Sequence, residues 1–403
     1  MIIRPKQIIY PLKYFGLSSA TAKVTERAFE EHLARFLGSK VYVKVIGRAR
    51  AGLYLLTKLA VRDAKRKVIL SPYTIPDVVS MVRFAGGEPV FVDCVPRSTN
   101  IDVDHLSDLI DEQTCCVIVT HYHFNQGDMT EICRLCASNG IMLVEDCALA
   151  FGSPLPDTRN SSTTTASVYS FSGFKTLNFF WGGAVATASA ELARRLSEEI
   201  DKWPQLLWHD YIGQMIKLAK YDVLTRNWVF PWFTFPLLKW KAQRLQKDVL
   251  PMVRVESTDL DHTILSRPSM HAIREWDRKL GMVDAFIRHR RNIAAIYISE
   301  LQDHLIAGET SKEVREASCL VNCPIDVDSK QRGEIIRRIF DKGFDVGMSL
   351  YPNVHELQGF SHIAGRSDNV ARLVRSVVTL PTHPRISEEY AHQLSTVIRH
   401  TIG

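Results

Sequence analysis

Two residues of opposite charge, Lys175 and Asp146, stand where the chain could perform covalent chemistry. Lys175 lies in SFSGFKTLNFFWGGA (170–184), where five aromatic residues and three glycines surround a single basic residue. Burying an ammonium group is unfavourable unless it is paired or neutralised, so this setting points to a special amine. Asp146 ends the apolar stretch IMLVED. A carboxylate there could cap a helix, bind a metal or pair with a ring nitrogen, and capping is the simplest interpretation of the residue alone.

Taken together, the two residues match the essential groups of a pyridoxal 5'-phosphate site. A carboxylate keeps the pyridine nitrogen of this cofactor protonated, so that the ring can withdraw electrons. A lysine forms a Schiff base with the cofactor aldehyde. It later moves a proton between Cα of the amino acid and C4′ of the cofactor. Each residue alone is a weak signal, and the ordered pair favours the cofactor.

The segment from about Val41 to Thr187 must position this pair. Its short apolar runs alternate with helical patterns of about 10–15 residues, which is typical of a parallel sheet covered by helices on both faces. Ligands of such sheets lie outside the carboxyl ends of the strands. The sequence therefore predicts that one rim of the sheet gathers 47–51, 71–74, 121–123, Asp146 and Lys175.

Length and composition indicate a packed globular protein of two domains. The chain has 403 residues, of which 46% are hydrophobic and 23% charged. We expect a large cofactor-binding domain over 1–255 and a small α+β domain over 256–403. The net charge of +6, from 50 basic and 44 acidic residues, suits small anionic ligands. It is too weak to suggest nucleic acid, and no nucleic-acid-binding motif accompanies it.

The eight cysteines do not form the spacing of a disulfide scaffold. Cys133 and Cys136 lie in a helical pattern, so we expect both on its buried side and predict no metal site. The first residues, MIIRPKQIIYPLKYFG, lack a signal-peptide pattern, and no apolar run reaches the roughly 18 residues of a spanning helix. These features predict a soluble cytoplasmic protein.

A tryptophan-rich segment, about 198–251, differs in kind from its surroundings. It holds five of the seven tryptophans, and Pro231 and Pro236 prevent a long straight helix. The simplest interpretation is a helical insertion that packs in a subunit interface or against the main domain. The alternative is a membrane-surface or lipid contact through 228–241, with aromatic anchors flanked by Lys239 and Lys241.

Six segments resemble, in the same order, those of the DegT/StrS-type sugar aminotransferases, a branch of the fold-type I pyridoxal-phosphate enzymes. They are GRARAGLYLLTKL, LSPYTIPDVVSMVRFAGGEPVFVDCVPRSTNID, VIVTHYHFNQGDM, VEDCALAFGS, SFSGFKTLNFFWGGAVAT and TLPTHP. The resemblance covers nearly the whole chain. It implies an α/β fold: a large domain with a mostly parallel seven-stranded sheet, and a smaller C-terminal α+β domain.

The resemblance also implies roles for individual residues. Lys175 matches the Schiff-base lysine and Asp146 the partner of the pyridine nitrogen. Ser170 matches a serine that binds the cofactor phosphate. Arg50 and Ala51 fall on a pair whose backbone amides, at a helix start, also hold the phosphate.

Arg267 matches an arginine in a segment that this family lends from the partner subunit, which implies a homodimer with shared active sites. Two histidines at a predicted strand end, His121 and His123, could touch the cofactor or be structural. Arg48 and Arg50 could each bind the phosphate or be solvated residues at a helix start.

Four positions depart from the family pattern. Leu149 replaces a glutamine, Phe174 a small residue, Leu265 an asparagine and Ile75 an aromatic residue that stacks on the cofactor ring. Each change should remove a hydrogen bond or stacking contact, about 1 kcal/mol apiece. Tyr73 is a candidate to replace Ile75 in stacking.

The function that these features favour is transamination. The amino donor implied by the resemblance is L-glutamate, and the acceptor is a nucleotide-linked keto-sugar. The unusual residues leave open a non-sugar carbonyl in specialised metabolism, or a degenerate member that only binds or regulates. Sugar dehydration, which some relatives perform with a histidine at the lysine position, is disfavoured by Lys175.

Overall fold

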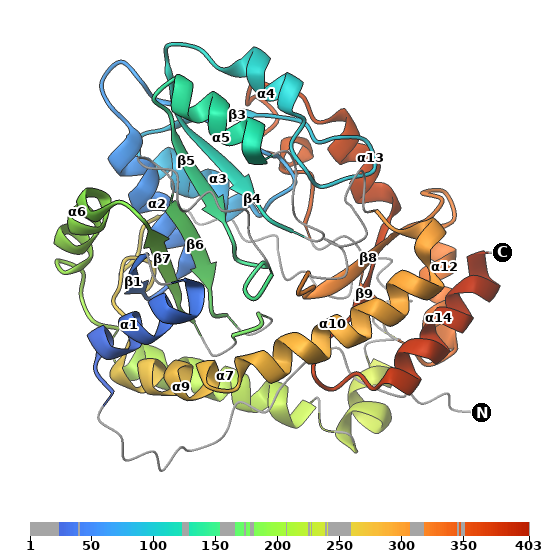
Figure 1. The fold of residues 1–403 in the computed structure, drawn as a ribbon. Helices are drawn as coiled ribbons and strands as arrows, with labels where there is room; N and C mark the ends of the chain where they lie inside the picture. The colour runs from blue at the N-terminus through green and yellow to red at the C-terminus, as the bar shows by residue number, and fades with distance from the viewer. Residues whose placement is uncertain are drawn as a thin grey trace.

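A computed structural model of the chain describes residues 24–38, 41–122, 129–153, 166–172, 175–177, 181–206, 208–224, 226, 228–237, 240, 259–306, 318–344, 346–347 and 351–402. A seven-stranded sheet lies at its centre (Figure 1). Its strands are β1 (Tyr42–Ile46), β2 (Lys67–Leu70), β3 (Glu88–Phe91), β4 (Thr114–Thr120), β5 (Met142–Asp146), β6 (Ala166–Ser170) and β7 (Gly183–Thr187). The spatial order is β1-β7-β6-β5-β4-β2-β3. Of the seven strands, β7 is the one that runs in the opposite direction to the others. The predicted mostly parallel sheet is confirmed.

Both faces of this sheet are covered, as continuous apolar strands require. In β2, Val68 and Leu70 join a core with α2, α3 and α6, whereas Ile69 points to the other face and meets α4 and α5. At the β1–β7 end, α1 and α9 cover that second face. These helices are α1 (Glu26–Leu37), α2 (Ala49–Ala60), α3 (Pro76–Phe84), α4 (Val103–Leu109), α5 (Met129–Ser138), α6 (Ala190–Ile200) and α9 (Met270–Leu280).

A second, smaller unit contains the antiparallel pair β8 (Asn322–Asp326) and β9 (Val377–Pro381). Its core is formed with α10 (Val283–Glu300), α12 (Arg332–Asp341) and α14 (Glu388–Ile402). The helix α13 (Asp368–Ser376) leads into β9, and one-turn helices occur at Gln302–His304 and Val354–Glu356. The predicted small α+β tail therefore has the expected elements.

Helix α10 joins the two units and crosses the lower part of Figure 1. Its first turns, with Val283 and Ile287, pack in the core of the large sheet, and Ile293 and Tyr297 belong to the small core. Since α9 also packs in the large core, the packing favours a division inside α10 rather than at 255/256. Only Gly281 and Met282 separate the end of α9 from the start of α10.

The described part of the tryptophan-rich segment is largely helical, as predicted. It contains α7 (Trp208–Leu224) and a π-helical turn, η2 (Phe230–Thr234), in which Pro231 is placed near the start. Among the described residues, no helix is long and apolar enough to cross a membrane. In α5, Cys136 is buried and Cys133 partly buried, and both are free thiols, which agrees with their predicted place on a packed helix.

Gly183 allows the first residue of β7 to approach two backbones at once. A Cβ atom there would lie 2.5 Å from the Tyr169 carbonyl oxygen and 2.9 Å from the Ala49 nitrogen. We expect Gly183→Ala to lower the free energy of unfolding by about 1–3 kcal/mol, because backbone atoms must move apart. Denaturant unfolding measures this change. Gly213→Ala in α7 is the control, since its Cβ would meet nothing within 4 Å; an equal loss in both variants would contradict the explanation.

Candidate active site

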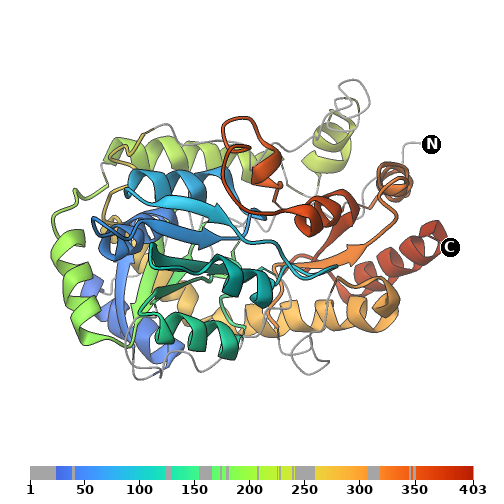
Figure 2. The same ribbon diagram turned by 90° about the horizontal axis from the view of Figure 1, so that it is seen from above.

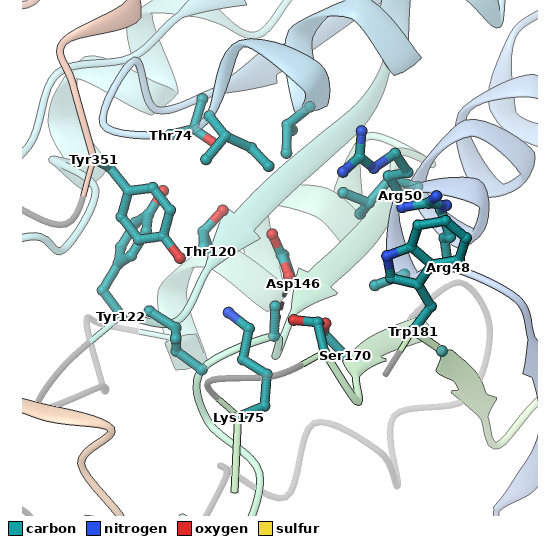
Figure 3. Close-up of a pocket in the computed structure, with 18 residues that line it drawn as sticks. Arg48, Arg50, Thr74, Thr120, Tyr122, Asp146, Ser170, Lys175, Trp181 and Tyr351 are labelled. Atoms are coloured by element: carbon teal, nitrogen blue, oxygen red, sulfur yellow. Dashed lines mark hydrogen bonds between the residues drawn. The ribbon is translucent and has the colours of Figure 1, made fainter. Parts of the chain in front are cut away.

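A cavity of about 210 Å³ opens where β4, β5 and β6 end and α2 begins (Figure 3). The predicted rim supplies much of its lining, including Arg50, Thr74, Asp146 and Lys175. Figure 3 shows Lys175 and Asp146 between two tyrosines on one side and a group of Arg48, Arg50 and Trp181 on the other. The cavity thus has an aromatic end, a cationic end and an acid–base pair between them.

Asp146 and Lys175 face each other across this cavity. Asp146 is the last residue of β5 and is 6% exposed; its Oδ1 accepts a hydrogen bond from the Ala148 amide at 3.0 Å. Burial raises the pKa of Asp146, while that hydrogen bond and the charges of Lys175 and His121 act in the opposite direction. Burial also lowers the pKa of Lys175 to about 8, opposed by Asp146. The lysine amine can therefore gain or lose a proton near neutral pH.

The first turn of α2 forms the floor of the cationic end. Its residues Ala49 and Arg50 line the cavity, and the N-cap residue Arg48 makes no side-chain cap. The first N–H groups of a helix point away from it and favour an anion. Ala51, by contrast, donates its N–H to the Arg48 carbonyl and is buried against Met81. Of the predicted amide pair, Arg50 therefore lines the cavity and Ala51 does not, whereas Ala49 lines it.

Two arginine side chains surround this helix start. Arg50 forms an ion pair with the buried carboxylate of Asp77. The Arg48 guanidinium carbon lies 3.3 Å from the centre of the Trp181 ring, and its Nε donates to the Thr263 carbonyl at 2.8 Å. Burial, followed by the nearby charge of Arg50, lowers the pKa of Arg48 to about 9. Neither arginine is a simple solvated residue, and the adjacent cations favour an anionic ligand.

Ser170 ends β6 beside this anion-favouring end. Its side chain is buried, lines the cavity, and donates to Ser172 Oγ at 3.3 Å. The Ser172 carbonyl in turn accepts the Lys175 amide at 3.0 Å. This short turn after β6 therefore carries Lys175 back over the end of the sheet toward Asp146.

The aromatic end is formed by Tyr122 and Tyr351, which sequence reasoning missed. Tyr73 is fully buried behind them, with ring centres 4.8 Å from Tyr122 and 5.7 Å from Tyr351, and the Tyr122 hydroxyl donates to the Tyr73 carbonyl. Tyr73 does not line the cavity, so the structure does not support it as the stacking residue. Tyr122 lies in the strand-end stretch HYHF and could have been noticed there. Trp181 belongs to the aromatic stretch 170–184 around Lys175, whereas Tyr351 had no comparable signal.

His121 points away from the cavity. Its Nε2 lies 2.7 Å from Glu145 Oε2, and both side chains are buried. Neighbouring residues of a strand face opposite sides of the sheet, so the side chains of Glu145 and Asp146 project apart. His121 lies on the side of Glu145, away from the cavity. The structural interpretation of His121 is correct. His123 and Phe174 lie outside the described residues.

The other singled-out residues divide between the cavity and its surroundings. Leu149 and Ile75 line the cavity and make part of its wall apolar. Leu265 packs near Ala51 and Ile264 instead. Arg267 pairs with Glu26 through Nη2 at 3.0 Å and does not line the cavity of its own chain. Its predicted role in a partner subunit stays a prediction.

Comparison with known sequences decides the relationship. A profile of the DegT/DnrJ/EryC1/StrS aminotransferase family matches residues 19–219 and 277–399. The chain belongs to this family. It is therefore a transaminase that depends on pyridoxal phosphate, as predicted. The match omits 220–276, so the family assignments of Leu265 and Arg267 fall in a part of the chain that the profile does not cover.

Individual relatives agree with this assignment. The chain is 25% identical over 397 residues to dTDP-3-amino-3,4,6-trideoxy-alpha-D-glucose transaminase of Micromonospora megalomicea subsp. nigra, which covers 97% of this chain and 93% of the relative. The fold of this chain is similar to that of PseC of Helicobacter pylori, an aminotransferase involved in the biosynthesis of pseudoaminic acid. The TM-score is 0.68 at 18% identity, with 94% of this chain and 91% of PseC covered. NtdA of Bacillus subtilis with bound cofactor PMP is also similar (TM-score 0.68, 18% identity, 95% and 78% covered). The predicted fold-type I architecture is confirmed.

Proposed function

We propose that this member transfers an amino group from an amino acid, L-glutamate, to the keto group of a nucleotide-linked sugar in the cavity between α2 and Tyr351. The observation that carries the proposal is the buried pair of Lys175 and Asp146 beside a cationic helix start. The similarity to a dTDP-sugar transaminase supports the acceptor class. The glutamate donor rests on the family resemblance.

The residues of the cavity fit pyridoxal phosphate. Within the described part of the chain, the Asp146 carboxylate accepts one hydrogen bond, and it faces the cavity where a ring N–H could supply another. The α2 start, Arg50 and Ser170 provide the polar and positive surroundings that a phosphate group needs. When bound, the cofactor supplies an electron sink and carries the amino group between donor and acceptor.

The side chains divide the remaining work. Asp146 would hold a proton on the ring nitrogen, because its carboxylate is more stable beside a positive charge than alone in a buried site. Lys175 Nζ would attach the cofactor and later move the proton of the donor's α-carbon, for which a pKa of about 8 is suitable. Leu149 and Ile75 would keep water from the reacting carbon atoms.

The acceptor can be tested directly. The protein would be loaded with pyridoxamine phosphate and mixed with keto-sugar nucleotides, the same sugars without the nucleotide, and simple ketones. We expect the nucleotide-linked sugars to restore the aldehyde form of the cofactor fastest, with an aminated sugar found by mass spectrometry. Faster reaction with simple ketones would contradict the sugar assignment. Failure with every carbonyl would contradict the proposed function.

Arg50 should contribute mainly to cofactor affinity. Arg50→Leu removes a charge beside the proposed phosphate position, and we expect the dissociation constant of pyridoxal phosphate to rise about tenfold to a hundredfold. Titration of cofactor absorbance and tryptophan fluorescence measures this without turnover. Arg62→Leu, at an exposed position after α2, is the control. Unchanged affinity in Arg50→Leu would place the phosphate elsewhere.

A homodimer with a shared site and a cytoplasmic location remain predictions from the resemblance and the sequence. Sedimentation of the purified chain would test the first. Arg267 pairs with Glu26 in its own chain and does not line the cavity of that chain. If it acts in the site of a partner subunit, Arg267→Ala should nevertheless weaken cofactor binding.

A further inference from the structure

Exposed apolar side chains concentrate on one part of the molecule, residues 208–240, here called the α7–η2 surface. Eleven large apolar side chains are exposed among the described residues, and nine of them lie on this surface. They are Ile212, Ile216, Val223, Leu224, Trp228, Trp232, Phe233, Leu237 and Trp240. Such a concentration marks an interaction surface rather than the scattered apolar exposure of an ordinary protein.

The aromatic residues of this surface are held in place by their buried neighbours. Phe230 and Phe235 are 1% and 2% exposed, and the Phe235 ring centre lies 4.4 Å from that of Phe340 in α12. Thr234 Oγ1 also donates to the Leu224 carbonyl at 2.6 Å, which ties η2 to the end of α7. From this anchored segment, Phe233 is 66% exposed. The segment therefore has one buried and one outward aromatic side.

The surface stands at the edge of the molecule. In Figure 2 the yellow-green helices of this region lie along the upper side, and the later part projects from the body. The family profile omits 220–276. The profile therefore does not include the later part of the surface, and the catalytic cavity does not include the surface either.

The surface also carries a small excess of positive charge. Residues 208–240 contain four basic and two acidic residues. Residues 241–247, which lie outside the described part of the chain, add three basic residues in the sequence.

We propose that the α7–η2 surface binds the face of a lipid bilayer that contains anionic lipids. Tryptophan and phenylalanine beside lysine and arginine are typical of segments that lie in the headgroup region. A second copy of the chain is the alternative occupant, and the experiments below distinguish it from a membrane. No described helix can cross the bilayer, so the chain binds to the surface of the membrane without spanning it.

Binding to vesicles tests this proposal on the intact protein. The purified chain would be sedimented with phosphatidylcholine vesicles and with vesicles in which phosphatidylglycerol replaces part of the phosphatidylcholine. We expect binding to the mixed vesicles, weaker binding at high salt, and little binding to phosphatidylcholine alone. Absence of binding to the mixed vesicles would overturn the proposal.

Matched variants locate the contact. Trp228→Ser with Phe233→Ser should reduce the vesicle partition coefficient about tenfold or more, since both rings leave the interface. The control is Tyr42→Ser with Met282→Ser, the two exposed large apolar residues that the described part of the chain has outside the surface. Equal loss in the two double variants would overturn the assignment to this surface.

Charge is tested in the same way. Lys220→Gln with Arg226→Gln should weaken partition about tenfold, because each basic residue near an anionic membrane contributes favourably. Arg62→Gln with Lys330→Gln changes the net charge equally at distant exposed positions and should have much less effect.

Light scattering measures the oligomeric state of the same variants. If the Trp228 and Phe233 changes split an oligomer while vesicle binding persists, the surface contacts a second copy and the membrane proposal fails.

Discussion

Replacing Lys175 with alanine should abolish covalent capture of pyridoxal phosphate and reduce amino transfer to below roughly a thousandth of the wild-type rate. Lys175 is the amine that lines the cavity beside Asp146. Borohydride reduction followed by mass spectrometry measures capture: the wild type should gain the mass of one cofactor and the variant none. Lys58→Ala, on the outer side of α2 and half exposed, is the control and should behave as the wild type.

The pH dependence of capture gives an independent test of Lys175. Only the deprotonated amine attacks an aldehyde, and the pKa of Lys175 is lowered to about 8. In the cofactor-free protein, the capture rate should rise with pH until about 8 and then level off. An ordinary lysine would continue to gain reactivity up to about pH 10. A rate that climbs steadily through pH 9 would contradict the buried setting of this amine.

Asp146→Asn should lower turnover by roughly a hundredfold to a thousandfold, because an amide cannot stabilise the positive ring nitrogen in a buried site. Cofactor capture should still occur, since Lys175 remains. The capture profile should also move to lower pH: the Asp146 charge raises the pKa of Lys175, and its removal takes that pKa further below 8.

A control for Asp146 is its neighbour in β5. Glu145→Gln changes a buried carboxylate of similar size that faces His121 instead of the cavity. It should lower the free energy of unfolding without the large loss of turnover. Near-normal turnover in Asp146→Asn, or an equal loss of turnover in Glu145→Gln, would remove Asp146 from its proposed role.

The sequence contained enough to predict the sheet and its reacting pair. Apolar strands that alternate with helices allow few arrangements, and the carboxyl ends of neighbouring parallel strands must meet at one rim. Lys175, Asp146 and Arg50 therefore came together at the rim as predicted, and Ser170, which the family resemblance had singled out, lines the same cavity. The family resemblance was confirmed over the two matched segments.

Side-chain direction was beyond the sequence. Tyr73 and Tyr122 both come from rim segments, yet Tyr73 is packed behind the ring that lines the cavity. Ala51 lies one position too far along α2, because its N–H already bonds to Arg48 within the first turn. Such differences of a single residue depend on helix register and on neighbours that are distant in sequence.

By itself, then, the sequence determined the fold class and the residues at strand ends, because periodicity and chain order restrict these strongly. The cofactor chemistry was indicated by the pair of Lys175 and Asp146 together with the family resemblance. Tertiary structure decided the wall of the cavity, where Tyr351 arrives from a segment 176 positions after Lys175. It also decided which aromatic residues of 228–237 are buried and which face outward. Both outcomes depend on long-range packing, which no local pattern of residues records.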